Sequence, residues 1–171
     1  AESIKTSLEG KEWDKILFSY HGIPERHVRK SDITKSHCKP NDSVNFECCK
    51  TASPAHEFCY KHQCYETTRQ VVEYLGIEPH QYFVSFQSRL AGDPWLQPYT
   101  DKMLEKYPNE GVKNLAVVTP AFVSDCLETL EEIAMEGKEE FLKAGGEKFY
   151  AIPCINDSDD WVDVLVNWME A

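Results

Sequence analysis

Positive charge and long apolar runs are both scarce in this sequence. Eighteen Lys and Arg residues face 29 Asp and Glu residues, a formal net charge of −11, which argues against binding to nucleic acid or to an anionic membrane. No apolar run approaches the length of about 18 residues that crosses a bilayer. Residues 1–11 are polar, unlike a signal peptide. We therefore expect a soluble, cytoplasmic chain with at most peripheral membrane association. Because no methionine precedes Ala1, we also expect a portion of a longer protein.

The cysteines are also unevenly distributed along the chain. Five of the seven cysteines lie within a segment, 27–64, that carries six Lys or Arg and four Asp or Glu in an otherwise acidic chain: Cys38, Cys48, Cys49, Cys59 and Cys64. A secreted disulfide fold needs an export signal and is usually small and loop-rich throughout. Clustered thiols in a reducing compartment indicate metal binding instead. We call the segment 28–64 the cysteine island.

Outside the island, short apolar stretches alternate with stretches of helical periodicity. This order predicts a single α/β domain over 1–171, with a four-stranded parallel sheet covered by helices on both faces. The expected strands are 15–20, 81–87, 114–119 and 148–152, and the expected helices are 60–75, 100–107, 125–144 and 160–169.

Three of these strands run into a proline-containing turn, at Pro24, Pro120 and Pro153. Ligands of open α/β sheets bind beyond the carboxyl ends of the strands, so we expect these turns to line any site. His21 lies at the first of these strand ends. A neutral imidazole there is a suitable proton acceptor, although a lone histidine at a strand end is more often bonded to a neighbouring loop.

The expected helix 125–144 carries carboxylates at four-residue intervals. Asp125 and Glu128 fit a capping box in its carboxylate variant, and Glu132, Glu136 and Glu140 follow along one face. Like charges at this spacing repel by a few tenths of a kcal/mol per pair. A solvated acidic stripe is a sufficient explanation for Glu136 and Glu140. Glu128 and Glu132 lie nearest the strand ends, where clustered carboxylates can bind a divalent cation or relay protons.

Three sequence blocks lie at or just past the strand ends: FSYHGIP at 18–24, QSR at 87–89 with DPWLQPYTD at 93–101, and PAFVSDCLETLEE at 120–132. In this order and at these separations, they resemble the C-terminal half of ferrochelatase, over nearly the whole chain except the cysteine island. The resemblance implies a flavodoxin-like, chelatase-type three-layer sandwich. It also implies insertion of Fe²⁺ into protoporphyrin IX to form haem, with the N-terminal half of the same protein as the missing partner. We expect the present chain to be inactive alone.

The resemblance also implies residue roles. His21 becomes the proton acceptor or a ligand of the substrate iron, and Glu128, opposite His21 across the porphyrin, and Glu132 handle metal or protons. Trp95 is either a loop anchor that fills the core or an aromatic plane against the porphyrin. Tyr20 is expected to help shape the pocket. Many relatives carry histidine where Cys126 stands, so Cys126 is either a passive small residue or a soft metal contact; we favour the passive role.

The cysteine spacings lack the two Cys-x₂-Cys pairs of a zinc ribbon. Four irregularly spaced thiolates suit a [2Fe–2S] cluster. Some ferrochelatases carry such a cluster, and the placement of this island resembles that in those ferrochelatases. We expect Cys38, Cys49, Cys59 and Cys64 as ligands, with Cys48 as the alternative to Cys49. Zinc is the second choice of metal. The alternatives for the whole chain are a chelatase for another tetrapyrrole and a non-catalytic iron–sulfur or zinc module on a flavodoxin-like scaffold.

Overall fold

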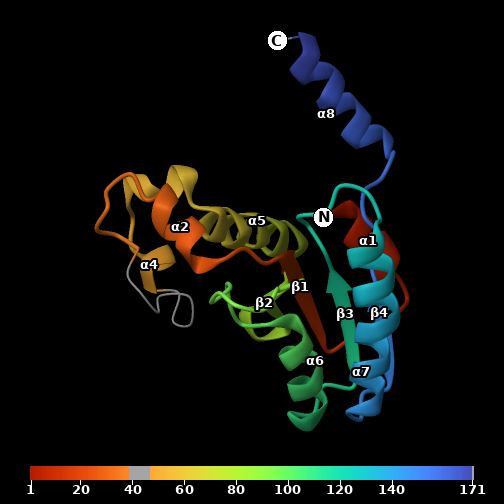
Figure 1. Ribbon diagram of the computed structural model, residues 1–171. Helices are drawn as coiled ribbons and strands as arrows, with labels where there is room; N and C mark the ends of the chain where they lie inside the picture. The colour runs from red at the N-terminus through yellow and green to blue at the C-terminus, as the bar shows by residue number, and fades with distance from the viewer. Residues whose placement is uncertain (39–46, 171) are drawn as a thin grey trace.

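Four parallel strands form the centre of the protein (Figure 1). A computed structural model describes residues 1–38 and 47–170. The strands are β1 (Lys15–His21), β2 (Tyr82–Gln87), β3 (Asn114–Val118) and β4 (Lys148–Ala151), in the spatial order β2-β1-β3-β4. Every neighbouring pair is parallel. This order is the flavodoxin-like one, and it confirms the expected α/β fold.

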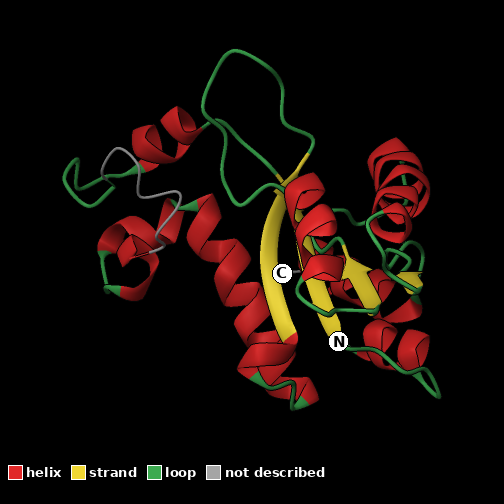
Figure 2. Ribbon diagram, turned by 90° about the horizontal axis from the view of Figure 1, so that it is seen from below, coloured by secondary structure: helices red, strands yellow, loops and turns green. Residues whose placement is uncertain are grey.

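Helices cover both faces of the sheet (Figure 2). Alternate residues of β1 point to opposite faces. Phe18 packs in the cluster that also holds α1 (Glu2–Leu8) and α5 (Tyr60–Leu75). Leu17 packs in the second cluster, and the helices on that face are α6 (Thr100–Asn109), η3 (Glu128–Gly137) and α7 (Lys138–Lys143). By the same alternation, His21 belongs to the face covered by α6 and η3.

Most of the expected elements form within one or two residues of their predicted ends. The helix 60–75 is confirmed as α5, which Gly76 terminates in a left-handed conformation with φ of 66°. The helix expected at 100–107 is α6, and Tyr99 is the residue that caps its start. Thr100 is buried, and its hydroxyl hydrogen-bonds those of Ser19 and Ser85.

The largest difference lies in the segment 125–144, which is not one α-helix. Residues Glu128–Gly137 form a π-helix, η3, and only Lys138–Lys143 continue as α-helix. The predicted capping box is also wrong, since Leu127 precedes the π-helix without a side-chain cap. The Asp125 carboxylate instead accepts hydrogen bonds from Asn156 Nδ2 at 2.8 Å and from Thr129 Oγ1 at 3.1 Å.

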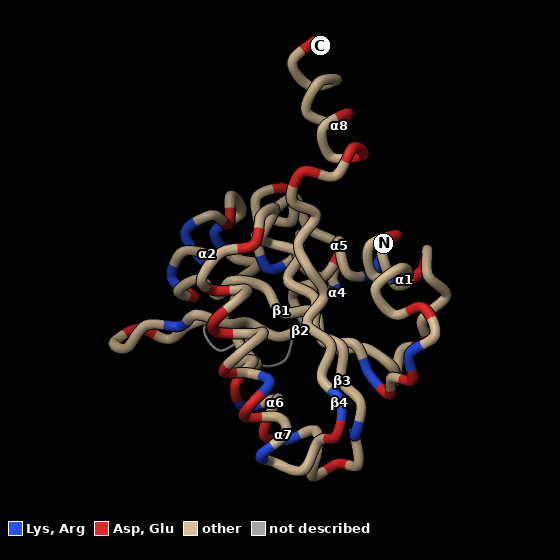
Figure 3. Tube along the Cα trace, turned by 90° about the vertical axis from the view of Figure 1, so that its right-hand side faces the viewer, with Lys and Arg blue, Asp and Glu red and all other residues tan. Residues whose placement is uncertain are grey.

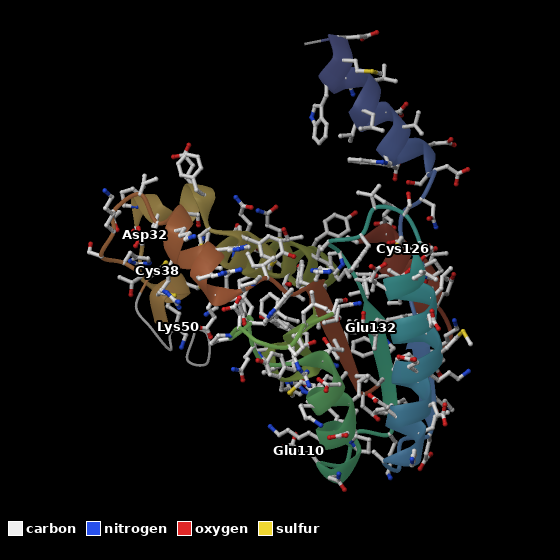
Figure 4. All side chains as sticks on the ribbon, viewed as in Figure 1. Asp32, Cys38, Lys50, Glu110, Cys126 and Glu132 are labelled. Atoms are coloured by element: carbon white, nitrogen blue, oxygen red, sulfur yellow. The ribbon has the colours of Figure 1, made fainter. Side chains whose placement is uncertain are left out.

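The cysteine island contains short helices that its sequence did not reveal. They are α2 (Glu25–Ser31), α4 (Glu47–Lys50) and η1 (Pro54–Phe58), and a further turn, η2 (Pro79–Gln81), follows α5. Basic residues colour α2 blue in Figure 3. Asp32 and Cys38 lie beyond the end of α2 in Figure 4, and the Asp32 carboxylate accepts hydrogen bonds from the backbone N–H groups of His37 and Cys38. The part of the predicted island at 39–46 lies outside the described residues.

The last helix, α8 (Asp159–Glu170), projects away from the rest of the protein (Figure 1). None of its residues is buried, and several large apolar side chains are exposed on it: Val162, Val164, Leu165, Val166, Trp168 and Met169. Across residues 1–38 and 47–170, no helix combines the length and the apolar character that a bilayer crossing requires.

Candidate active site

His21 is the last residue of β1, and one short hydrogen bond orients its ring. Its Nδ1 lies 2.6 Å from the carbonyl oxygen of Gly22. A carbonyl oxygen only accepts hydrogen bonds, so Nδ1 carries the proton and donates it. The other ring nitrogen, Nε2, then keeps a lone pair. This tautomer makes Nε2 a proton acceptor or a metal ligand, the chemistry that the sequence predicted for His21.

The backbone beside His21 is packed against β2 and the loop that follows it. Gly22 donates its N–H to the Gln87 carbonyl oxygen at 2.8 Å. A Cβ atom on Gly22 would lie 2.9 Å from that oxygen and 3.3 Å from Cε3 of Trp95. The Trp95 and Phe122 ring centroids lie 6.4 and 5.9 Å from that of His21. Trp95 is only 9% exposed, which favours its role as a loop anchor over that of an exposed aromatic plane.

Tyr20, the other residue expected at the pocket, points to the opposite face of the sheet. It is buried, and its hydroxyl group hydrogen-bonds that of Thr68 on α5 at 2.9 Å. Burial raises the pKa of Tyr20 far above its usual value. As the chain folds here, the Tyr20 ring supports α5 and is not exposed to a substrate beside His21.

Glu128 lies at the start of η3, within electrostatic range of His21. A hydrogen bond with the Cys126 side chain, followed by one with the backbone, outweighs burial and lowers the pKa of the Glu128 carboxyl. Figure 4 shows Cys126 at this end of the helix. An ionised carboxylate at this end of the helix can attract a divalent cation or accept a proton.

Glu132, also labelled in Figure 4, lies farther along the same helix, and the loop after β2 holds its carboxylate. Ser88 donates its backbone N–H at 2.8 Å and its hydroxyl at 2.5 Å, and Gln87 Nε2 donates at 3.2 Å. Ser88 has a φ of 62°, which is unusual for a residue other than glycine. Gln87 Nε2 also donates to the Glu128 carbonyl oxygen at 2.9 Å. These contacts attach the first turns of η3 to the end of β2.

Glu136 and Glu140, the next two carboxylates expected along this helix, line a cavity of about 260 Å³ between η3, α6 and the end of β2. Burial, followed by repulsion from Asp101 and Glu105, raises the pKa of Glu140. Arg89 binds Asp101 through both oxygens at 2.6 and 2.9 Å, and these bonds outweigh burial and lower the pKa of Asp101. Glu136 and Glu140 thus border an acidic cavity that also contains Arg89. Within the described part of the chain, no three His, Cys, Asp or Glu side chains are arranged to hold one metal ion.

Comparison with known proteins identifies the family. The family model described as ferrochelatase matches residues 1–171. The chain belongs to the ferrochelatase family. It is 51% identical over 162 residues to the ferrochelatase of Opitutus terrae, which is 92% of this chain and 46% of that protein. The ferrochelatase of Ectopseudomonas mendocina is 47% identical, over 95% of this chain and 46% of its own length. That of Pseudomonas entomophila is 43% identical, over 99% and 49%. The chain thus spans about half the length of the curated ferrochelatases it matches.

Family membership does not by itself explain the cysteine island. No disulfide joins its five cysteines: Cys59 and Cys64 are buried, and Cys38, Cys48 and Cys49 are half-buried. Burial raises the pKa of Cys64 to about 12. Burial and the neighbouring Cys48 raise the pKa of Cys49 to about 12. Burial also raises the pKa of Cys59, and Cys48 contributes. Cys48, Cys49, Cys59 and Cys64 are thus neighbours that can supply thiolates once a metal displaces their protons.

The chemistry of these donors fits a [2Fe–2S] cluster, in which each iron takes two cysteine ligands rather than three or four at one ion. Lys61, 2% exposed, lies on the same buried face of α5 as Cys64. It lowers the pKa of both Cys49 and Cys59, although burial outweighs it. A buried cation is suited to anionic thiolates.

The sequence did not predict the residues whose hydrogen bonds hold Glu132 and His21 in place. They are Gln87 and Ser88, which bind Glu132, and Tyr60, whose hydroxyl donates to the His21 carbonyl oxygen at 2.7 Å. Gln87 and Ser88 stood in a quoted block without an assigned role. Tyr60 had no signal, because it follows His21 by 39 residues and contacts only its backbone.

Proposed function

We propose that this chain supplies the metal-inserting site of a ferrochelatase, a lyase that inserts Fe²⁺ into protoporphyrin IX in the last step of haem biosynthesis. One observation carries the proposal: the His21 ring commits Nδ1 to the Gly22 carbonyl, which leaves the Nε2 lone pair able to accept a proton or to bind a metal. The family of the chain and the order of its motifs support the same function.

In the proposed reaction, two pyrrole N–H protons leave the porphyrin as Fe²⁺ enters. His21 Nε2 is placed to accept a proton, and Glu128 is an anionic group for the metal or a second proton. Glu132 is proposed to hold η3 to the loop after β2 and so to keep Glu128 in a fixed position relative to His21. Glu132 is also a candidate for passing metal or protons toward the acidic cavity. Trp95 is proposed to support the ring of His21 from behind.

We propose that the partner which completes the site is the N-terminal half of the same protein. The full-length protein is therefore the right material for the test. We expect His21→Ala to abolish anaerobic Fe²⁺ insertion and to weaken porphyrin binding, measured by quenching of porphyrin fluorescence. His80→Ala is the control, because His80 is exposed beyond α5. Full activity in His21→Ala contradicts the proposal. Binding of a different tetrapyrrole in preference to protoporphyrin identifies another chelatase, and failure to bind any tetrapyrrole favours a non-catalytic metal module.

We also propose that the cysteine island binds a [2Fe–2S] cluster through Cys38, Cys49, Cys59 and Cys64, with Cys48 as the alternative to Cys49. The absence of disulfides among these cysteines supports this, and reduced cysteines fit the expected cytoplasmic location. When bound, the cluster would supply a structural cross-link or an oxidant-sensitive group, since iron insertion needs no net electron transfer.

The test of the cluster is metal and sulfide analysis of the purified chain together with its visible spectrum. Iron and acid-labile sulfide near two per chain, lost in Cys59→Ser and retained in Cys154→Ser, support the proposal. A colourless protein with one zinc ion contradicts it and favours the zinc alternative. If the cluster is structural, Cys59→Ser also lowers the melting temperature. Unchanged stability with an altered response to oxidants indicates sensing.

A further inference from the structure

Three histidines lie together in the cysteine island, in the part of Figure 4 where Cys38 and Lys50 are labelled. His37 lies in the loop after α2, His56 in η1 and His62 in the first turn of α5, and all three are half-buried. The imidazole rings of His56 and His62 are stacked, with 3.7 Å between their centroids and 12° between their planes. The His37 ring meets that of His56 edge-on, at 5.1 Å. None of the three has a role in the functions proposed above.

Two of these rings and one backbone carbonyl group form a triangle of polar atoms. His37 Nε2 and His56 Nε2 lie 3.2 Å apart, and the Cys48 carbonyl oxygen lies 2.8 Å from the first and 3.0 Å from the second. Cys48 belongs to α4, a helix of four residues. The last four carbonyl groups of a helix have no partner within it, so the Cys48 oxygen is available to groups outside α4.

Hydrogen bonds alone cannot satisfy all three sides of this triangle. A neutral imidazole carries one N–H, on either ring nitrogen, and a carbonyl oxygen only accepts. If both Nε2 atoms carry protons, both can donate to Cys48, but the two N–H groups then face each other across 3.2 Å. If either Nε2 lacks its proton, its lone pair faces the lone pairs of the Cys48 oxygen across 2.8 or 3.0 Å. Every assignment of protons therefore leaves one repulsive contact.

A divalent metal ion removes this conflict, because it attracts all three lone pairs at once. Imidazole nitrogens bind zinc at about 2.0–2.1 Å, so two ligand atoms of one ion lie about 2.9 Å apart at a right angle and about 3.3 Å apart in a tetrahedron. The sides of the triangle are 2.8, 3.0 and 3.2 Å, close to this range. The three atoms are thus already spaced as neighbours in one coordination shell.

The surrounding contacts hold both histidines in this arrangement. The His37 N–H donates to the Asp32 carboxylate at 2.9 Å. The His56 N–H donates to the Ser53 carbonyl oxygen at 3.1 Å, and the stacked ring of His62 supports its imidazole. Groups that orient the ligands of a metal ion raise its affinity, because less freedom is lost when the ion binds.

We propose that His37 Nε2, His56 Nε2 and the Cys48 carbonyl oxygen bind one zinc ion, with water completing its coordination shell. Imidazole is a favourable ligand for zinc, and sites with three protein ligands commonly hold water in the remaining position. The ion joins the loop after α2 to α4 and η1, three short segments of the cysteine island. The site uses no sulfur atom and neither His21 nor Glu128, so it is independent of the proposed cluster and of the proposed chelatase function.

Zinc binding by the purified chain tests the site, with the cysteines reduced and without added iron or sulfide. The variants are His37→Gln and His56→Gln, because a glutamine amide keeps an N–H for the Cys48 carbonyl but is not among the usual zinc ligands. The matched control is His27→Gln, which changes an exposed histidine of α2. The cysteines are the same in every variant, so differences between variants report the histidines alone.

We expect the parent and His27→Gln to bind one zinc ion more than His37→Gln or His56→Gln, measured by equilibrium dialysis and metal analysis at micromolar free zinc. The loss of a ligand should weaken this site by more than about tenfold, since changing even an outer-shell partner of a metal ligand costs that much. Zinc at ten times its Kd should slow the acylation of His56 by diethyl pyrocarbonate by about tenfold in the parent. It should not slow this acylation in His37→Gln. Peptide mass spectrometry gives these rates.

Two results overturn the site: equal zinc binding by the parent and both glutamine variants, or zinc protection of His56 that persists in His37→Gln. The second result would mean that zinc on the nearby thiolates shields His56. Urea denaturation without metal separates the loss of a ligand from the loss of the fold, because both glutamine variants should unfold at the same urea concentration as the parent. Acylation of His37 in His56→Gln repeats the test on the other ligand.

Discussion

The packing around Gly22 leaves no room for a side chain. Its backbone is not in the left-handed region, yet an added Cβ would lie 2.9 Å from the Gln87 carbonyl oxygen and close to Trp95. We expect Gly22→Ala to push the ends of β1 and β2 apart and to lower the free energy of unfolding by about 1–3 kcal/mol, as overpacking does. Urea denaturation of the chain measures this. A variant as stable as the parent would show that the strand ends can separate without cost.

Asp125 makes the stability of the chain depend on pH. Burial alone raises its pKa, but hydrogen bonds from Asn156, Cys154 and Thr129 outweigh burial and lower the pKa below 3.8. A carboxyl whose pKa is lower in the folded state stabilises the fold above its unfolded pKa, and this stabilisation disappears as the pH falls through the folded value. Asp125→Ala should therefore cost about 1 kcal/mol near pH 7, and the difference from the parent should shrink below about pH 4.

Denaturant unfolding at pH 7 and pH 3 checks this expectation. Asp157→Ala is the control, because Asp157 is exposed in the loop after β4, next to Asn156, and should show no pH-dependent difference from the parent. A cost for Asp125→Ala that is equal at both pH values would mean that the neutral acid makes the same contacts as the carboxylate.

At this scale, the sequence named candidate reacting groups but was silent about their supports. His21 and Glu128 stay predictions, made because each stands at the end of a recognisable strand or block. Tyr60 and Ser88 were missed, because Tyr60 binds only the backbone carbonyl of His21 and Ser88 reaches Glu132 across 44 residues of sequence. Tyr20 shows the reverse error, since it is a buried support on the opposite face of the sheet, whereas Trp95 takes the loop-anchor role that was one of its two predicted roles.

Hydrogen bonds from the loop that follows β2 anchor the helix η3. Glu132 accepts three hydrogen bonds from Gln87 and Ser88, whereas Glu136, four residues on, is exposed on the same helix. We expect Glu132→Ala to destabilise the chain by about 2 kcal/mol, since it leaves donors without their acceptor. Glu136→Ala should stay within about 0.5 kcal/mol of the parent. Thermal and urea unfolding of the matched pair measure both. Equal effects of the two substitutions would contradict the anchoring role of Glu132.

The sequence did not predict that η3 is a π-helix. Carboxylates four apart and apolar residues three or four apart suit an α-helix, and an α-helix was the prediction. A π-helix bonds i to i+5 and is rare because its backbone geometry is less favourable. Here the Glu128 carbonyl accepts from Gln87 and the Glu132 carboxylate from Ser88, so contacts from another strand hold the first turns. Such contacts exist only once the sheet has formed.

At the scale of the whole molecule, α8 adds nothing to the core of this chain. None of its residues is buried, and Trp168 and Met169 are 67% and 80% exposed. We expect a chain shortened to 1–158 to unfold within about 0.5 kcal/mol of the parent, as surface changes do. Calorimetry and urea denaturation provide the comparison. A marked loss of stability in the shortened chain would show that α8 packs against the sheet in solution.

The chain alone is expected to insert iron into porphyrin at a negligible rate. The chain spans about half the length of the ferrochelatases it matches, and the other half is proposed to complete the site. Anaerobic assay of the chain beside the full-length protein gives the comparison. Measurable turnover by the chain alone would contradict this expectation and would show that one half holds both substrates.

The sequence by itself determined the sheet and its covering helices, and it predicts the chemistry at the strand ends. Apolar strands, glycine and proline stops and side-chain types are local properties that can be read along the chain. Only the tertiary structure decided that residues 128–137 form a π-helix, that Glu132 is held by the β2 loop, and that Tyr60 reaches His21 from the cysteine island. These features depend on backbone groups brought together from distant positions, and contacts of that kind leave no periodicity or motif in the sequence.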